Sequence, residues 1–412
     1  MAQLNIILNQ EEILQLLSDN RDEAFRSLLK DSLNRILKAE SAEQLKAGFY
    51  ERTDERTDSR NGSRDKPLVT RIGKIELKVP RHRNIPFKTM IFDNYTRSEA
   101  ALIAGMAEMV VNGVSTRKVS RIIETLCGTS YSKSTVSELC KDLDCRVEEF
   151  RNRPLTKAYP FLTVDATYFK VRENHRIISK ALLIAFGTDQ EGHREIIGCG
   201  VYTGETKETW RSFLAGLKAR GLRNVLMITS DAHEGIRYAI SREFPDVPWQ
   251  RCQFHFAKNI VDKTPKKYQA GIRAELQEIF NCATVEAARK KRDSILQDYQ
   301  DVAEAAMACL EEGFESAMTV MSIPWSLRLY FRTSNHIERV NRELKRRSRV
   351  IGIFPNEASL IRLMGSVLME LNEKCQAGKS IFTTEVYKSL LQSEIPMKLI
   401  KIAAEQRRLL AA

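Results

Sequence analysis

A single carboxylate, Asp165, ends the short apolar run Phe161-Leu162-Thr163-Val164 and is followed by Ala166-Thr167. Aromatic and β-branched residues of this kind favour a β-strand, so we expect a strand over 161–165 with Asp165 at its end. Taken alone, an aspartate that follows a strand is most often a turn or helix-cap residue. Asp165 becomes a candidate functional residue only when two later acidic residues are considered together with it.

Two later segments carry one acid each. Asp231 ends the apolar run Met227-Ile228-Thr229-Ser230, and Glu338 lies in the arginine-rich, helix-like segment 333–347. Three converging carboxylates suit hard divalent cations, because Mg²⁺ prefers oxygen ligands, and two ions about 4 Å apart can bind both the attacking and the leaving oxygen of a phosphodiester. We predict that Asp165, Asp231 and Glu338 are catalytic and bind two Mg²⁺ ions, for which Mn²⁺ should substitute. The simpler interpretation of Glu338 is an i,i+4 partner for Arg342.

The order of elements around these acids predicts the fold class. Three strands, a helix, a strand, a helix and a strand form the order of the ribonuclease H-like fold, in which the first and fourth strands are neighbours and each ends in an aspartate. A helical pattern over 256–330 accounts for the long interval before Glu338, so we predict an α/β ribonuclease H-like core interrupted by an all-α insertion. The expected strands are 161–165, 177–187, 195–201, 225–229 and 248–252, and the helices between them are 206–220 and 235–244.

The N-terminal part shows other patterns. Helical spacing covers 10–48, the polar stretch 50–66 indicates a linker or mobile loop, and alternation over 67–80 predicts a β-hairpin with a basic polar face. Three short helices with a glycine-bearing turn are expected within 97–149. They suit a helix-turn-helix that docks in the major groove, although plain three-helix packing is the alternative. The candidate DNA contacts in this region are Arg117, Lys118 and Lys133.

Composition narrows the class of partner and the compartment. The chain has 412 residues and a formal net charge of +12, which favours a polyanionic partner such as nucleic acid. We expect no membrane span, because no run of about 18 apolar residues occurs, and no secretory signal. The eight cysteines are scattered without a CxxC pair, so we expect reduced thiols, a cytoplasmic location and no four-cysteine zinc site.

Several further residues have both a functional and a structural interpretation. Cys252 and His255 form a lone CxxH; zinc would need two more ligands, none obvious nearby, so a structural role is favoured. His233 could contact a phosphate or cap a helix. The run 345–347 is basic with only Glu343 close by to offset it, which favours phosphate binding over a solvated charged face. The candidate DNA contacts on this predicted helix are Arg339, Arg342, Lys345 and Arg346, with Glu338 and Asn341 on the same face as Arg342 and Lys345.

With these motifs in this order, the chain resembles the Mutator-like transposases of bacterial insertion sequences, over roughly residues 60–375. His82 stands where the family has an acidic residue, and Ile85-Pro86 replaces a glycine-containing stretch; both departures lie outside the catalytic motifs. The matching segments are Thr163-Val164-Asp165-Ala166, Thr229-Ser230-Asp231-Ala232-His233, Cys252-Gln253-Phe254-His255, Thr333-Ser334-Asn335-His336-Ile337-Glu338-Arg339-Val340-Asn341, Pro80-Arg81-His82-Arg83-Asn84, Gly113-Val114-Ser115-Thr116-Arg117 and Ser132-Lys133-Ser134-Thr135-Val136-Ser137.

The resemblance implies a DDE transposase in which Asp165, Asp231 and Glu338 bind Mg²⁺ and Cys252 and His255 form a structural motif. It also implies recognition of terminal inverted repeats, a homodimer on double-stranded DNA, a circular intermediate and a nucleoid-associated, bacterial protein. A non-catalytic repressor and a nuclease that never joins strands are the rival hypotheses. The expected regions are 1–50 (helical), 51–96 (linker and hairpin), 97–155 (helix-turn-helix), 156–255 (core), 256–330 (insertion), 331–380 (core) and 381–412 (C-terminal helix).

Overall fold

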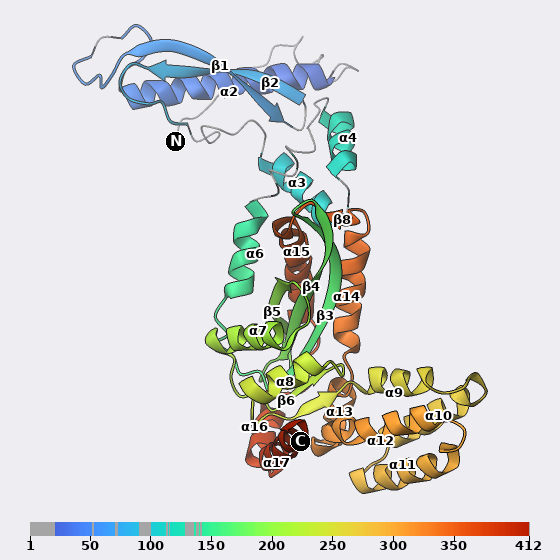
Figure 1. Ribbon diagram of the computed structural model, residues 1–412. Helices are drawn as coiled ribbons and strands as arrows, with labels where there is room; N and C mark the ends of the chain where they lie inside the picture. Colours follow the sequence, from blue (N-terminus) through green and yellow to red (C-terminus); the bar gives the residue numbers. More distant parts are fainter. Residues whose placement is uncertain are drawn as a thin grey trace. The chain divides into compact units, whose positions relative to one another are not determined.

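The computed structural model of the chain describes residues 21–411, leaving out 52, 71–72, 90–99, 113, 115, 128–135, 137–139 and 141 (Figure 1). The chain divides into two compact units, Met1–Lys141 and Asp142–Ala412. The division falls inside the region 97–155 that we predicted as one helix-turn-helix, so the segment from Asp142 onward belongs with the second unit. Among the helices that the structure describes, none combines the length and apolar character needed to span a bilayer.

The first unit begins with a helix packed on a two-stranded hairpin. Helix α2 (Arg21–Leu45) packs on β1 (Arg60–Thr70) and β2 (Gly73–His82), which pair antiparallel. Side chains along β2 alternate between buried and exposed, as the sequence pattern predicted. The part of the predicted helical stretch before residue 21 lies outside the described residues. The buried core of this hairpin and helix is Leu37, Leu68, Ile75, Leu77, Val79 and Phe87.

The predicted linker over 50–66 is wrong for its second half, because β1 already begins at Arg60. The side chains of 61–65 are exposed, so hydrophobic alternation gave no signal there, while the backbone pairs with β2 up to Arg60 opposite His82. Arg60 anchors the start of the strand: its guanidinium lies 5.0 Å from the centre of the Phe49 ring and donates 2.8 Å hydrogen bonds to the carbonyls of Ala47 and Gly48.

Asp58 closes the open end of the hairpin. Its carboxylate accepts hydrogen bonds from the backbone N–H groups of Ser59, Asn84 and Ile85 at 2.7, 2.8 and 2.8 Å. The bonds from Ile85 and Asn84 lower the pKa of Asp58 to about 2. Because the folded pKa lies below the unfolded value of about 3.9, this contribution to stability is complete above that value and disappears as the pH falls towards 2.

We therefore expect amide protection at Asn84 and Ile85, corrected for intrinsic exchange, to fall as the pH drops from about 4 towards 2. Hydrogen exchange measured by mass spectrometry on peptides covering 58–85 checks this. An Asp58→Asn variant should show low protection at every pH in this window, since its amide cannot reproduce a carboxylate's acceptor pattern. Equal pH dependence in both proteins would contradict the role of Asp58.

Two short helices complete the described part of the first unit. Helices α3 (Ala100–Val111) and α4 (Thr116–Cys127) confirm the two predicted helices. The third predicted helix, with Lys133, lies almost entirely outside the described residues, so the helix-turn-helix arrangement stays a prediction. A small apolar cluster joins these helices to the hairpin through Val69, Met106, Val119, Ile123 and Val136.

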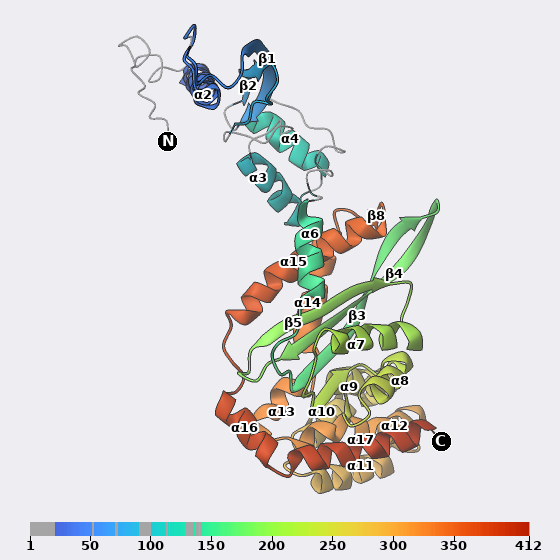
Figure 2. The same cartoon turned by 90° about the vertical axis from the view of Figure 1, so that its left-hand side faces the viewer.

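The second unit is built on a mixed sheet of order β5-β4-β3-β6-β7 (Figure 2). β3 pairs antiparallel with β4 and parallel with β6, while β8 adds a short parallel pairing to the far end of β3. All five predicted strands are present; β8 was missed, because two residues carry no periodicity. The strands are β3 (Phe161–Glu173), β4 (Arg176–Thr188), β5 (Arg194–Tyr202), β6 (Met227–Ser230), β7 (Trp249–Arg251) and β8 (Ile353–Phe354).

The prediction that the first strand ends at Asp165 is wrong. β3 continues to Glu173, and it pairs with β4 residue by residue as far as Glu173 opposite Arg176. β6, by contrast, pairs with β3 only from Phe161 to Thr163. Asp165 therefore lies where β3 leaves its parallel neighbour β6 and continues along β4.

Helices cover both faces of this sheet (Figure 2). α7 (Lys207–Ala219) and α8 (Glu234–Glu243) pack against one face, where the fully buried Trp210 meets the core side chains of β3 and β4. α14 (Asn335–Ser348) and α15 (Glu357–Gln376) contact β3 on the other side, and α6 (Asp142–Asn152) packs on α15. α15 carries Gly365 at this crossing, since a Cβ there would lie 2.3 Å from Val147 Cγ1.

Residues 253–331 contain only helices and turns, as predicted for the insertion. They share one apolar core, and the first helix starts at Gln253, so the CxxH motif lies at its N-terminus rather than in the preceding strand. The elements are α9 (Gln253–Asp262), a 3₁₀ turn (Lys266–Tyr268), α10 (Gln269–Phe280), α11 (Val285–Tyr299), α12 (Glu304–Met318), a second 3₁₀ turn (Thr319–Ser322) and α13 (Trp325–Phe331).

The C-terminal segment forms two helices, α16 (Thr384–Gln392) and α17 (Ile395–Ala411), where we predicted one within 381–412. Pro396 explains the break, because proline lacks an N–H and its ring clashes with the carbonyl four residues earlier, whereas the first turn of a helix tolerates it. α17 then covers β7: Trp249 N–H donates to Gln406 Oε1 at 2.8 Å, and Gln406 Nε2 donates to the Trp249 carbonyl at 2.8 Å.

Candidate active site

The sheet brings the two predicted aspartates together. Thr163 on β3 pairs with Thr229 on the parallel β6, and Asp165 and Asp231 each follow two residues later on these neighbouring strands. They therefore lie level with each other, just past the point where the parallel pairing of β3 with β6 ends. The predicted adjacency of the two strands is confirmed.

The two carboxylates share a partly buried environment. Burial, and next the negative charge of Asp231, raise the pKa of Asp165 to about 7. Ala166 N–H donates to Asp165 Oδ1 at 2.9 Å. Asp231 Oδ1 is buried and has no hydrogen-bond partner within the described part of the chain. A buried, unsatisfied carboxylate oxygen beside a second carboxylate is a place where a hard cation would bind favourably.

Glu338 lies in the first turn of α14 and faces a histidine. Its Oε1 is 3.7 Å from His255 Nε2 and accepts a 3.3 Å hydrogen bond from Ser334 Oγ. The alternative i,i+4 pair with Arg342 is absent from the ion pairs among the described residues. Among the described residues, the possible ligand atoms of Glu338, Cys252 and His255 lie within 4.8 Å of one another, and neither aspartate belongs to this group. The structure therefore places Asp165 next to Asp231, whereas Glu338 lies next to His255.

Asn341, one turn after Glu338, connects α14 to the acid pair. Its Nδ2 donates to Asp165 Oδ2 at 2.8 Å. The sequence placed Asn341 on the same helical face as Glu338 but assigned it no role. Glu205 was missed altogether, because a lone acid after Gly204 carries no pattern. Its charge adds to the rise in the pKa of Asp165, and it accepts a 3.3 Å hydrogen bond from Trp210 Nε1.

Cys252 and His255 lie at the start of α9, beside the start of α14. Cys252 Sγ accepts a 3.3 Å hydrogen bond from Ser334 N–H and lies 3.2 Å from Ser334 Oγ. Burial raises the pKa of Cys252, but hydrogen bonds with His255 and Ser334 outweigh it and lower that pKa. Hydrogen bonding with Cys252 raises the pKa of His255 to about 9 against the effect of burial.

The expectation that no further zinc ligand lies near the CxxH needs correction. Glu338 supplies one: the ligand atoms of Cys252, His255 and Glu338 all lie within 4.8 Å of one another. Sequence reasoning missed it because the glutamate comes from a distant helix. His233 takes the helix-cap role of its two options, since Gly235 N–H donates to His233 Nδ1 at 3.2 Å at the start of α8.

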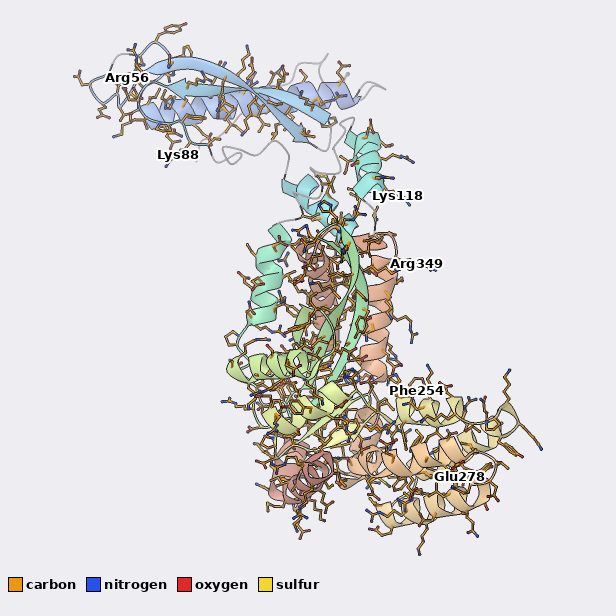
Figure 3. All side chains as sticks on the ribbon, viewed as in Figure 1. Arg56, Lys88, Lys118, Phe254, Glu278 and Arg349 are labelled. Atoms are coloured by element: carbon orange, nitrogen blue, oxygen red, sulfur yellow. The ribbon has the colours of Figure 1, made fainter. Side chains whose placement is uncertain are left out.

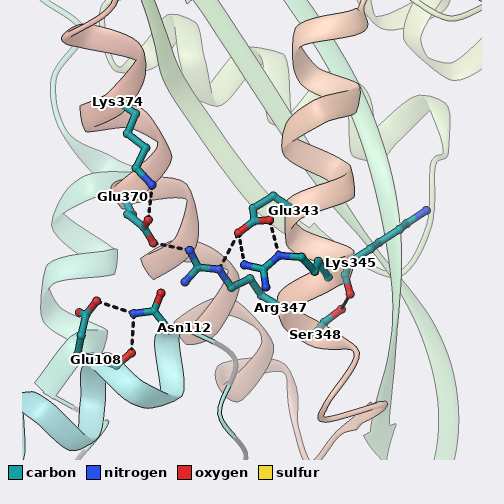
Figure 4. A network of polar contacts seen from close by, with 9 residues as sticks. Glu108, Asn112, Glu343, Lys345, Arg347, Ser348, Glu370 and Lys374 are labelled. Carbon is teal, nitrogen blue, oxygen red and sulfur yellow. Dashed lines mark hydrogen bonds and ion pairs between the residues drawn. The ribbon is translucent and has the colours of Figure 1, made fainter.

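The predicted basic run 345–347 is partly neutralised (Figure 4). Arg347 is buried between Glu343 and Glu370, at 2.8 Å from each, so it holds α14 to α15 rather than facing solvent. Arg346 is exposed but forms two 2.7 Å hydrogen bonds with Glu343. The remaining predicted cations that the structure describes are exposed: Arg117 and Lys118 on α4, the latter labelled in Figure 3, and Arg339, Arg342 and Lys345 on α14.

Comparison with known proteins identifies the family of the chain. Residues 1–378 match the family described as transposase, Mutator family. The chain is 42% identical over 378 residues to the transposase for insertion sequence element IS256 in transposon Tn4001 of Staphylococcus aureus, covering 91% of this chain and 97% of that one. It is 37% identical over 361 residues to the transposase for ISRM5 of Rhizobium meliloti, covering 88% and 90%. It is 36% identical over 388 residues to the transposase for IS1081 of Mycobacterium tuberculosis, covering 94% of each. The chain therefore belongs to the Mutator family of transposases.

Proposed function

We propose that the chain is a DDE-type transposase with a ribonuclease H-like core. It cuts one DNA strand at the end of its element, leaving a 3′-hydroxyl, and joins that hydroxyl to another phosphodiester. The observation that carries the proposal is the pair of aspartates at level positions on neighbouring parallel strands, in a family of transposases. The central position of β3 between β4 and β6 is the order expected for such a core.

The chemistry of the site fits Mg²⁺. Asp165, Asp231 and Glu338 offer hard oxygen ligands, and Asp231 Oδ1 is buried without a hydrogen-bond partner among the described residues. A cation there would offset the repulsion that raises the pKa of Asp165. Once bound, two Mg²⁺ ions, or Mn²⁺ in their place, would supply Lewis acidity to the phosphate and a better nucleophile from water or the 3′-hydroxyl.

The chain's own side chains hold these acids in place. Asn341 orients Asp165 by donating to Oδ2, and Ala166 N–H binds the other oxygen. Cys252 and Ser334 fix the start of the helix that carries Glu338. No residue of the site has to form a covalent bond to DNA, because water and then the 3′-hydroxyl are the nucleophiles.

The remaining parts of the proposal concern DNA and assembly. The exposed cations of α4 and α14 bind the phosphates of double-stranded DNA, and the N-terminal unit recognises the terminal inverted repeats. The protein acts as a homodimer on DNA, through a circular intermediate, in the bacterial cytoplasm at the nucleoid. The net charge of +12 supports a polyanionic substrate.

The test is incubation of the full chain with the end sequence of its own element. With Mg²⁺ or Mn²⁺ we expect a nick that leaves a 3′-hydroxyl, followed by a joined product on a denaturing gel. With EDTA we expect binding in a mobility-shift assay but no cleavage. Hydrolysis without joining would identify a nuclease instead. Binding without cleavage in either metal would favour a repressor.

A further inference from the structure

A cavity of about 650 Å³ lies in the second unit, lined by residues of α8, β7, α11, α12 and α17. This volume is within the range of small-molecule sites. Its walls combine apolar side chains of α17 with four arginines, Arg237, Arg251, Arg289 and Arg407. The transposase chemistry proposed above uses none of these residues.

Three of these arginines lack partners at buried atoms. The Nε atoms of Arg237, Arg251 and Arg407 are buried without a hydrogen-bond partner in the described part of the chain. Arg407 is the least enclosed of the three, and its Nη2 lies 3.9 Å from Asp246 Oδ1. Arg251 is the most enclosed, 8% exposed, and it forms no ion pair with a carboxylate of the described residues. Burial lowers its pKa, while the charges of Cys309 and Glu312 and a hydrogen bond with Cys309 act in the opposite direction. A buried guanidinium that is only partly satisfied by its neighbours is costly, so the unpartnered Nε of Arg251 favours an anionic ligand at this position.

The surroundings are shaped around Arg251. Its guanidinium lies 4.7 Å from the centre of the Phe256 ring. Gly313 of α12 leaves room for it, because a Cβ there would lie 2.3 Å from Arg251 Nη1. Glycine inside a helix costs about 1 kcal/mol relative to alanine. Arg237 is held in a similar way, with its guanidinium 5.1 Å from the centre of the Trp249 ring.

The acids around the cavity restrict its ligand. Glu286, Glu312 and Glu405 are exposed at the rim, and Glu315 is already paired with Arg289 at 2.8 Å. Arg251 is therefore the buried cation of the cavity, and these carboxylates lie at its exposed surface. Rim carboxylates would repel a continuous DNA backbone but admit a compact anion with an apolar part.

We propose that this cavity binds the phosphate of a small phosphate-bearing ligand of nucleotide size, with Arg237, Arg251 and Arg407 around the phosphate and the apolar wall of α17 against the remainder. Guanidinium groups suit this role because their forked donors match phosphate oxygens. The phosphate belongs either to a free nucleotide or to the 5′ end of a DNA strand. The inference does not depend on the cleavage chemistry.

The experiment is calorimetric titration of the full-length protein, in EDTA, with inorganic phosphate, dAMP and a 5′-phosphorylated trinucleotide. We expect saturable binding of dAMP, weakened at least about thirtyfold in Arg251→Met and in Arg237→Met. Arg242→Met is the matched control, since Arg242 is an exposed arginine of α8 outside the cavity lining. It should bind as wild type does.

A second readout separates binding from folding. Replacing an unpaired buried arginine by methionine should leave the ligand-free melting temperature unchanged or raised, while the increase in melting temperature caused by dAMP disappears. Binding of the phosphorylated trinucleotide alone, lost in both cavity variants, would assign the site to a DNA end. No saturable binding of any probe, or equal binding by Arg251→Met, Arg237→Met and wild type, would overturn the proposal.

Discussion

Asp231→Asn is expected to lower strand joining on the order of 10³-fold, about 4 kcal/mol of transition-state stabilisation. The amide removes a negative charge from the acid pair, and with it one hard ligand for the cation. DNA binding should be unchanged in a mobility-shift assay. Rates of nicking and joining on end DNA with Mg²⁺ measure the effect.

The same variant should not lose stability. Asp231 lies beside Asp165 and helps to raise its pKa, so removing the charge relieves repulsion in the folded state, and the melting temperature should stay the same or rise. Asp262→Asn, at an exposed aspartate of α9, is the control and should retain full activity. An Asp231→Asn protein that is active, or that loses activity because it is unfolded, would contradict the assignment.

Trp210→Ala should destabilise the second unit by about 3 to 5 kcal/mol. The indole is fully buried between α7 and the sheet, and alanine leaves a large cavity. The chain has three tryptophans, at positions 210, 249 and 325, all within Asp142–Ala412. Urea unfolding followed by the fluorescence of the remaining two therefore reports on this unit alone.

Two controls separate volume from hydrogen bonding. Trp210→Phe keeps most of the buried ring but loses the bond to Glu205, so a loss of about 1 to 2 kcal/mol is expected. Trp325→Ala removes a side chain that is 58% exposed and should change the free energy of unfolding by about 0.5 kcal/mol or less. Equal losses in Trp210→Ala and Trp325→Ala would contradict the core position of Trp210.

Much of the second unit could be predicted because its elements follow strong periodic signals. Trp210, Phe213, Leu214 and Leu217 lie at helical spacing and form the buried side of α7. Strands that are held by backbone pairing alone left no pattern of apolar residues in the sequence. Residues 61–65 form a strand with exposed polar side chains, and β8 is too short for any pattern. The extension of β3 past Asp165 was hidden for a similar reason, since an acid suggested the end of a strand that its partner β4 continues.

The site was predictable where chain order determines neighbours. A strand order with β6 beside β3 places Asp165 next to Asp231. Contacts made by a distant helix could not be foreseen: the hydrogen bond from Asn341 to Asp165 spans 176 residues of sequence. The same holds for Arg347. The sequence predicted an exposed cation, but the structure pairs it with Glu370 of α15.

The pairing of Gln406 with Trp249 has a consequence for biosynthesis. The two residues are 157 positions apart, so a ribosome working at about 5 to 20 residues per second makes the second roughly 8 to 30 s after the first. Until then, the backbone of Trp249 lacks its two hydrogen bonds with Gln406. The last strand of the sheet, β8, ends at Phe354, but the edge at β7 is covered by Gln406 only when the last helix has been translated. Chains that stop before α17 would keep an open edge that can pair with a neighbouring nascent chain.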